Sequence, residues 1–158
     1  MNKISKLIYF FVTFIFLTLL DKYFSNLIIN NTEKLHENPI FDFVLLPNQG
    51  AAFSILQNSR IFLIAFSVFA ICFILFYTIK HLSQTSGIAL FFTAMMTAGI
   101  FCNMYERIFL GYVLDYIKLN FIDFPVFNIS DVLINIGVIG IVIIIIKNNY
   151  FKNNETDN

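Results

Sequence analysis

The chain has 158 residues, of which 58% are hydrophobic and only 13% carry charge, and its mean hydropathy is +0.78. A soluble domain of this size keeps about a quarter of its residues charged, so the composition excludes an ordinary soluble protein and indicates a single domain, residues 1–158, in lipid. The formal net charge is zero and no basic tract stands out, so nucleic acid is not expected as a partner.

Four uncharged stretches predict four membrane-crossing helices, since a helix needs roughly 20 apolar residues to cross a bilayer. The expected spans are approximately residues 4–21, 61–80, 87–106 and 130–147. The first and last stretches are short and adjoin Asp21 and Asp131. A short aspartate cannot extend to the headgroups as a lysine does, so both carboxylates are expected at or just inside one membrane interface, facing a polar cavity.

The N-terminus also resembles the start of a secretory signal, because Lys3 and Lys6 precede an apolar core. The core ends in Asp21-Lys22-Tyr23-Phe24 instead of small residues suited to cleavage, so we expect an uncleaved first span. Five of the ten Lys and Arg residues fall on each side of the predicted bundle. The two lysines before the first span favour cytoplasmic termini.

Both long connections then lie on the outer side. Residues 40–46 alternate partly between apolar and polar and are followed by Pro47-Asn48-Gln49-Gly50, which predicts strands and a turn at the membrane surface. The second connection, residues 111–127, is apolar apart from a few residues such as Asp115 and Lys118. We expect it to dip into the interface as a loop over the site.

The cysteines and histidines predict no metal site. Cys72 and Cys102 fall in apolar stretches, whereas His36 and His81 lie far apart in polar connections. This spacing offers neither a disulfide framework nor a metal-binding pair. No metal or cofactor is expected.

Four polar clusters gather on the outer side: Asp21-Lys22, Asn48-Gln49-Gly50-Ala51-Ala52-Phe53, residues 103–107 with Asp115, and Asn128-Ile129-Ser130-Asp131. In order and spacing they resemble the lipoprotein signal peptidase (signal peptidase II) family over essentially the whole chain. That family has Asp after span one, then Asn-x-Gly-Ala-Ala-Phe, Gly-x-x-x-Asn-x-x-Asp-Arg, Gly-x-Val-x-Asp and Phe-Asn-x-Ala-Asp. The matching segments here begin at Asp21, Asn48, Gly99, Gly111 and Phe127.

The resemblance implies a four-helix bundle in the bacterial inner membrane, with a small strand-containing element and the active site on the periplasmic face. It implies an aspartyl endopeptidase that removes the signal peptide from diacylglyceryl-modified prolipoproteins by cutting before the lipidated cysteine. Asp115 and Asp131 would be the catalytic pair. The resemblance assigns support of the site or the substrate to Asp21, Asn48, Gly50, Gly99, Asn103, Arg107 and Asn128. The implied partners are the lipidated substrate and membrane lipid, and a monomer is expected.

The chemistry suits these residue types. Two carboxylates facing each other in a poorly hydrated site cannot both ionise easily, so they share a proton and titrate together. The charged partner takes a proton from water, while the protonated one polarises the scissile carbonyl. Asp115 and Asp131 are too far apart in sequence to meet along one helix. They meet if the connection containing Asp115 folds over the start of the fourth span.

Several positions depart from the family pattern, which usually continues after span one as Asp-Gln-x-Ser/Thr-Lys. The lysine position is Ser25 here, although Lys22 lies three residues away and, by hypothesis, leans over the same helix face. The other departures are Cys102 for Gly, Glu106 for Asp and Ser130 for Ala.

Other interpretations remain open on the residues alone. Asn128-Ile129-Ser130-Asp131 is also a helix N-cap sequence, with Asn128 as the cap and Asp131 in the first turn; this is compatible with catalysis. The departures suit a relative that binds lipoprotein precursors or lipids without cleavage. A small subunit that carries protons through buried carboxylates is the third alternative, but its acids would lie at several depths instead of one.

Overall fold

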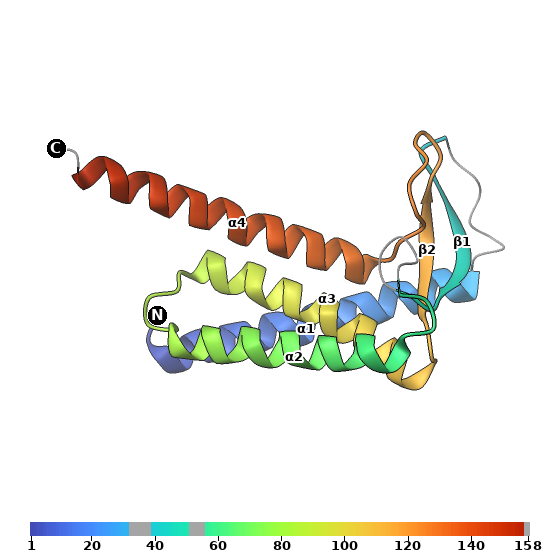
Figure 1. Cartoon of the computed structure of the whole chain (residues 1–158), viewed down its shortest axis with the longest axis horizontal. Helices are drawn as coiled ribbons and strands as arrows, with labels where there is room; N and C mark the ends of the chain where they lie inside the picture. The colour runs from blue at the N-terminus through green and yellow to red at the C-terminus, as the bar shows by residue number, and fades with distance from the viewer. Residues whose placement is uncertain (32–38, 51–55, 157–158) are drawn as a thin grey trace.

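The computed structural model describes residues 1–31, 39–50 and 56–156, with the side chains described up to residue 148. Ala51, Ala52 and Phe53 of the predicted motif lie outside the described residues. Figure 1 shows the elements: α1 (Lys3–Asn31), β1 (Phe41–Asn48), α2 (Arg60–Lys80), α3 (Gly87–Phe109), β2 (Val113–Leu119) and α4 (Ile129–Thr156).

Four helices in the described part of the chain are long and apolar enough to cross a membrane: α1, α2, α3 and, within α4, Ile129–Asn148. Apolar side chains on their outward faces are exposed, among them Ile8, Phe66 and Ile139, as expected of helices solvated by lipid. The predicted fold class, a four-helix membrane bundle with a small strand-containing element, is confirmed.

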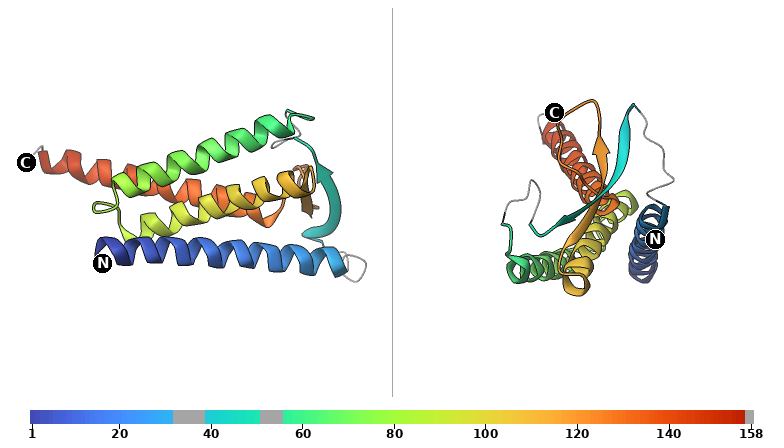
Figure 2. Two further views of the ribbon diagram at one scale, coloured as in Figure 1. Left: turned by 90° about the horizontal axis from the view of Figure 1, so that it is seen from below. Right: turned by 90° about the vertical axis from the view of Figure 1, so that its right-hand side faces the viewer.

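Helix α3 is the centre of the bundle and packs against α1, α2 and α4, as the end-on view in Figure 2 shows. Its buried face carries small residues, including Ala94, Ala98 and Gly99. A Cβ at Gly99 would collide with the backbone carbonyl oxygen of Ser130 and with the Ile134 side chain. Gly99 therefore allows the backbones of α3 and α4 to approach closely near the start of α4.

A two-stranded antiparallel sheet lies at one end of the bundle (Figure 1). Asn48 pairs with Val113 and Leu46 with Asp115, and the register shifts between Phe43 and Leu46. The second connection was expected as a loop, but its first part is strand β2. Pairing with β1 supplies partners for backbone groups that would otherwise be buried without any, and residues 120–128 form the remaining non-helical connection.

Helix α1 continues ten residues beyond the predicted span, so Asp21 does not mark its end. Residues 22–31 contain neither Gly nor Pro, and Ser25 and Ile28 continue the buried face of the helix. Asp21 is only 2% exposed. Helix α4 likewise runs past residue 147 to Thr156.

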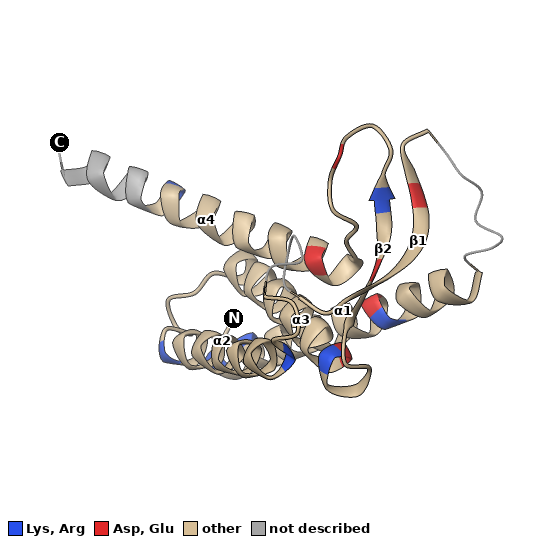
Figure 3. Cartoon of the chain, turned by 45° about the vertical axis from the view of Figure 1, so that its right-hand side comes forward, with Lys and Arg blue, Asp and Glu red and all other residues tan. Residues whose placement is uncertain are grey.

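The acidic residues of the described side chains gather at the end of the bundle that carries the sheet, as Figure 3 shows. Lysines lie at both ends, with Lys80 and Lys147 at the opposite one. The predicted convergence of the acidic clusters on a single side is therefore present in the fold.

At that opposite end, the Lys6 ammonium group fastens α1 to the turn between α2 and α3. Its Nζ donates to the carbonyl oxygens of Leu82 at 3.0 Å, Ser83 at 2.9 Å and Thr85 at 2.7 Å. These three bonds use all three N–H donors of the ammonium group.

We expect Lys6→Met to lower the melting temperature of the detergent-solubilised protein by several degrees. Hydrogen bonds to a charged group contribute about 1.5–3 kcal/mol each at most, and the partial exposure of this site reduces that value. Thermal unfolding of the variant measures the effect, with Lys3→Met as the control because Lys3 is exposed on the same helix. Equal melting temperatures for the two variants would contradict the role of Lys6.

Candidate active site

Asn128 is the N-cap of α4 and forms a reciprocal pair of hydrogen bonds with Asp131. The Asp131 backbone N–H donates to Asn128 Oδ1 at 2.9 Å, and the Asn128 backbone N–H donates to Asp131 Oδ2 at 3.2 Å. The predicted cap is present, and it fixes the direction in which the Asp131 carboxylate points.

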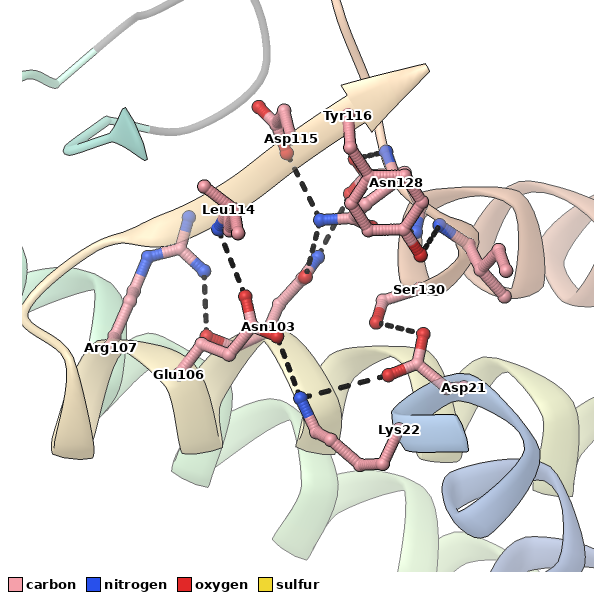
Figure 4. A network of polar contacts seen from close by, with 12 residues as sticks. Asp21, Lys22, Asn103, Glu106, Arg107, Leu114, Asp115, Tyr116, Asn128 and Ser130 are labelled. Carbon is pink, nitrogen blue, oxygen red and sulfur yellow. Dashed lines mark hydrogen bonds and ion pairs between the residues drawn. The ribbon is translucent and has the colours of Figure 1, made fainter. Parts of the chain in front are cut away.

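The Asn128 side chain also forms hydrogen bonds with Asp115 and with Asn103, which itself bonds to Asp131. Its Nδ2 donates to Asp115 Oδ1 at 3.0 Å and to Asn103 Oδ1 at 3.3 Å. Asn103 Nδ2 in turn donates to Asp131 Oδ1 at 2.8 Å. Figure 4 shows Asn103 on α3 and Asp115 on β2 converging on Asn128. The two aspartates are thus connected through two asparagines.

Asp115 is 3% exposed, on a strand where Val113 and Tyr116 are also buried. Its second oxygen, Oδ2, accepts from Asn48 Nδ2 at 2.9 Å. Every donor found here for the four carboxylate oxygens of Asp115 and Asp131 is a neutral amide. Within the described residues, the two carboxylates are therefore oriented without a direct hydrogen bond from a cation.

Burial raises the pKa of Asp115 from its ordinary value of 3.8 to about 7. The hydrogen bond from Asn48 opposes this rise in pKa, the charge of Asp131 adds to it, and Arg107 opposes it. Asp115 therefore holds a proton well above the pH at which an exposed aspartate loses it.

Arg107 links α3 to the turn after β1. Its Nη2 donates to the Gly50 carbonyl oxygen at 2.7 Å and its Nη1 to the Asn103 carbonyl oxygen at 3.2 Å. The Gly50 backbone N–H donates to Asn48 Oδ1 at 2.9 Å. Asn48, Gly50 and Arg107 therefore form one chain of contacts that ends on the Asp115 carboxylate.

Asp21 and Gly99 lie behind this group. Asp21 Oδ1 accepts from Ser130 Oγ at 2.7 Å, so a buried carboxylate of α1 holds the first turn of α4. Gly99 brings α3 close to the same turn. Among the described residues, neither Asp21 nor Gly99 bonds to Asp115, and both act on the position of α4.

Three further contacts were not predicted from the sequence. Arg60 Nε and Nη2 donate to the carbonyl oxygens of Arg107 at 2.7 Å and Ile108 at 2.9 Å, capping the end of α3. Tyr116 Oη accepts from the Ile129 backbone N–H at 3.3 Å. Glu106 Oε2 accepts from the Leu114 backbone N–H at 2.9 Å. Of these three contacts, only that of Arg60 has a signal in the sequence, because an arginine stands at the start of a predicted helix. The sequence does not show which helix end Arg60 caps.

Asp115 and Asp131 open onto a cleft of about 1230 Å³ that also takes in Asn48, Asn103 and Arg107. Helices α2, α3 and α4 and the connection after β2 supply its walls. Several apolar side chains, including Leu63, Phe66, Ile100, Phe127 and Ile134, line it. The cleft thus combines polar groups around the two aspartates with a run of apolar side chains, which suits a peptide that continues into an apolar segment.

Comparisons with known proteins agree with this arrangement. The family model for signal peptidase (SPase) II matches residues 13–147. The chain belongs to the signal peptidase II family. It is 38% identical over 108 residues to the lipoprotein signal peptidase of Streptococcus thermophilus strain CNRZ 1066, covering 68% of this chain and 70% of the relative.

Other relatives support the same family. The lipoprotein signal peptidase of Clostridium tetani is 34% identical over 118 residues, which cover 73% of this chain and 75% of the relative. A solved structure described as a bacterial membrane enzyme superposes with a TM-score of 0.77 at 26% identity, over 89% of this chain and 88% of the other. The predicted family is confirmed, and the chain is a multi-pass membrane protein of a protease family.

We expect Asp115→Asn to stabilise the protein increasingly as the pH rises. The folded-state pKa of Asp115, about 7, exceeds that of an unfolded aspartate, so wild-type stability falls between about pH 4 and pH 7 as the buried group is forced to ionise. Each unit of pKa difference corresponds to about 1.4 kcal/mol, which sets the full effect at a few kcal/mol. The asparagine variant lacks this titration.

The measurement is the difference in melting temperature between Asp115→Asn and wild type at pH 5 and at pH 8. Asp123→Asn serves as the control, because Asp123 is exposed in the connection after β2. A difference that stays constant or shrinks toward pH 8 would show that Asp115 is not a buried acid of raised pKa.

Proposed function

We propose that this chain is an aspartyl endopeptidase that removes the signal peptide from diacylglyceryl-modified prolipoproteins, cutting before the lipidated cysteine. The observation that carries the proposal is the placement of Asp115 and Asp131. Both line one deep cleft, and both are oriented by neutral amide donors around Asn128. Membership of the signal peptidase II family supplies the substrate class.

Their environments give the two carboxylates different roles. Asp115 is buried on a strand and its pKa is raised to about 7, so it is the partner that holds the shared proton and polarises the scissile carbonyl. Asp131 lies in the first turn of α4, where the helix N-terminus favours a negative charge. Asp131 is therefore the partner that takes a proton from the attacking water.

The protonation states then change in a balanced way. Water adds to the carbonyl carbon as Asp131 accepts its proton, and Asp115 donates its proton to the carbonyl oxygen. As the C–N bond breaks, Asp131 gives its proton to the leaving amine, and one hydroxyl of the tetrahedral intermediate gives its proton back to Asp115 and becomes the new carbonyl oxygen. Two interacting carboxyl groups titrate as a pair, so this cycle restores one shared proton after each turnover.

The cleft suits a substrate that lies partly in lipid. Its apolar wall from α2 and α4 matches the apolar core of a signal peptide, while the residues around the scissile bond must leave the helical form and need polar partners. Asn48, Asn103 and Arg107 line the same cleft and are the polar partners that we propose for this part of the substrate.

The same proposal sets the orientation. The end that carries the sheet and the acidic residues would face the periplasm of an inner membrane, with both termini in the cytoplasm. The proposed active form is a monomer. No cofactor takes part in the proposed reaction.

We expect Asp115→Asn and Asp131→Asn each to lower cleavage more than about a hundredfold, because each removes one member of the acid–base pair. The assay is the gel shift of a diacylglyceryl-modified prolipoprotein in detergent micelles. Asp42→Asn is the matched control, since it removes an acidic group from the same side of the molecule at a residue of β1 that does not line the cleft.

The outcomes separate the alternatives. Cleavage by wild type and control, absent from both variants while each keeps its thermal transition, supports the proposal. A folded wild type that cuts none of several lipidated substrates would favour a relative that binds precursors without cleaving them. Cleavage that survives either substitution would remove the roles given to Asp115 and Asp131.

A further inference from the structure

Glu106 is a buried carboxylate that lies between α1 and β2. It is 8% exposed. Its Oε1 accepts from Lys22 Nζ at 2.7 Å, and its Oε2 accepts from the Leu114 backbone N–H at 2.9 Å. Figure 4 shows Glu106 between the Lys22 ammonium group and the backbone of β2. One carboxylate thus connects a transmembrane helix to the residue next to Asp115.

The backbone N–H of Leu114 points away from the partner strand. It donates to Glu106 Oε2, so Leu114 and Pro47 form a non-hydrogen-bonded pair of the antiparallel ladder. The register shift between Phe43 and Leu46 interrupts the ladder on the other side of Asp115. Glu106 therefore supplies, next to Asp115, an anchor for the outer edge of β2 that the sheet itself does not provide.

Lys22 sets the charge and the orientation of this anchor. A buried carboxylate without a cation is strongly disfavoured, and Lys22 Nζ is the cation that contacts Glu106. Lys22 also lies 3.7 Å from Asp21 Oδ2 and 5.4 Å from the centre of the Tyr105 ring. These contacts hold the ammonium group on the α3 side of α1.

We propose that Lys22 and Glu106 are a pair of positioning residues that fixes β2 at Leu114 and thereby sets the place of Asp115 relative to Asp131. This inference rests on the proposed peptidase function for its effect on turnover. Neither Lys22 nor Glu106 lines the cleft, so the pair acts on the alignment of Asp115 and not on substrate binding.

The pair also accounts for two departures from the family pattern. Ser25, at the usual lysine position, is 4% exposed and contacts the Tyr116 hydroxyl. The lysine stands three residues earlier on the same helix face, and the acid is one methylene longer than the usual aspartate. In this chain the two departures are in direct contact, because Lys22 Nζ lies 2.7 Å from Glu106 Oε1.

The first test is a double-mutant cycle on cleavage of a lipidated prolipoprotein, with Lys22→Met, Glu106→Gln and the double variant. Each single change should lower kcat about tenfold and change KM less than about twofold, and the double variant should lose no more than the worse single one. Lys80→Met, at the opposite end of the bundle, is the control. Additive losses, an unchanged kcat or a loss confined to KM would overturn the proposal.

A charge exchange separates positioning from simple ion pairing. Lys22→Glu combined with Glu106→Lys keeps opposite charges, but a lysine at position 106 has no acceptor for the Leu114 N–H. We expect this variant to remain as impaired as the single ones. Recovery to wild-type kcat would show that the ion pair alone matters and that the contact with Leu114 does not.

A readout without substrate keeps this proposal distinct from the proposed function. Hydrogen exchange at the Leu114 amide, measured by NMR in detergent, should be at least tenfold faster in Lys22→Met and in Glu106→Ala than in wild type. The Ile117 amide, which donates to the Phe127 carbonyl oxygen, should change little. Unchanged exchange at Leu114 would overturn the proposal even in an active enzyme, whereas an inactive wild type with the expected exchange would contradict only the peptidase assignment.

Discussion

The carboxamide of Asn128 is the contact on which the rest of this site depends. Its Oδ1 caps α4 by accepting from the Asp131 backbone N–H, while its Nδ2 donates to Asp115 and to Asn103. An asparagine has both an acceptor and a pair of donors on one rigid plane, so one side chain sets the helix start and both aspartates together. An aspartate would cap the helix equally well but would place a third negative charge, with no donor, between two carboxylates.

The bundle is arranged so that this plane lies at the end of α3. Gly99 lets α4 approach α3 at Ser130, and Ser130 in turn donates to the buried Asp21 of α1. The start of α4 is therefore held by contacts with α3 and α1, in addition to its contacts with the sheet. Helix α2 also packs against α3. The cleft lies between α2 and α4. The central helix α3 therefore both positions α4 and separates α2 from α4 at the cleft.

The sequence predicted the parts of this structure that local patterns determine. Apolar stretches of membrane-crossing length located the four helices, and the Asn128 cap followed from the residue types at a helix start. The family resemblance located the clusters that converge. Long-range pairing was harder to predict, and β2 was expected as a loop because its partner β1 lies far away in sequence. The extension of α1 past Asp21 was missed for a local reason, because the charged Asp21-Lys22 pair resembled a helix end.

Contacts that run from a side chain to a distant backbone were the least predictable. Nothing in the sequence shows that Arg60 caps α3 or that Glu106 accepts from the Leu114 amide. Such contacts depend on the packing of whole elements and not on any periodic pattern. The departures at Lys22 and Glu106 appeared unrelated in sequence, 84 residues apart, and became one feature only when α1 and α3 were placed side by side.

The position of Arg107 illustrates how stability and chemistry oppose each other here. A guanidinium bonded directly to Asp115 or Asp131 would stabilise the buried charges but would hold both carboxyl groups ionised, and then neither could donate a proton. Arg107 instead gives its hydrogen bonds to the carbonyl oxygens of Gly50 and Asn103, while neutral amides orient the carboxylates. The arrangement accepts a less stable ionised form of Asp115 and keeps a proton available between the two aspartates. Glu106 already has its own cation in Lys22, so this nearby acid does not draw Arg107 away from the Gly50 turn that supports Asn48.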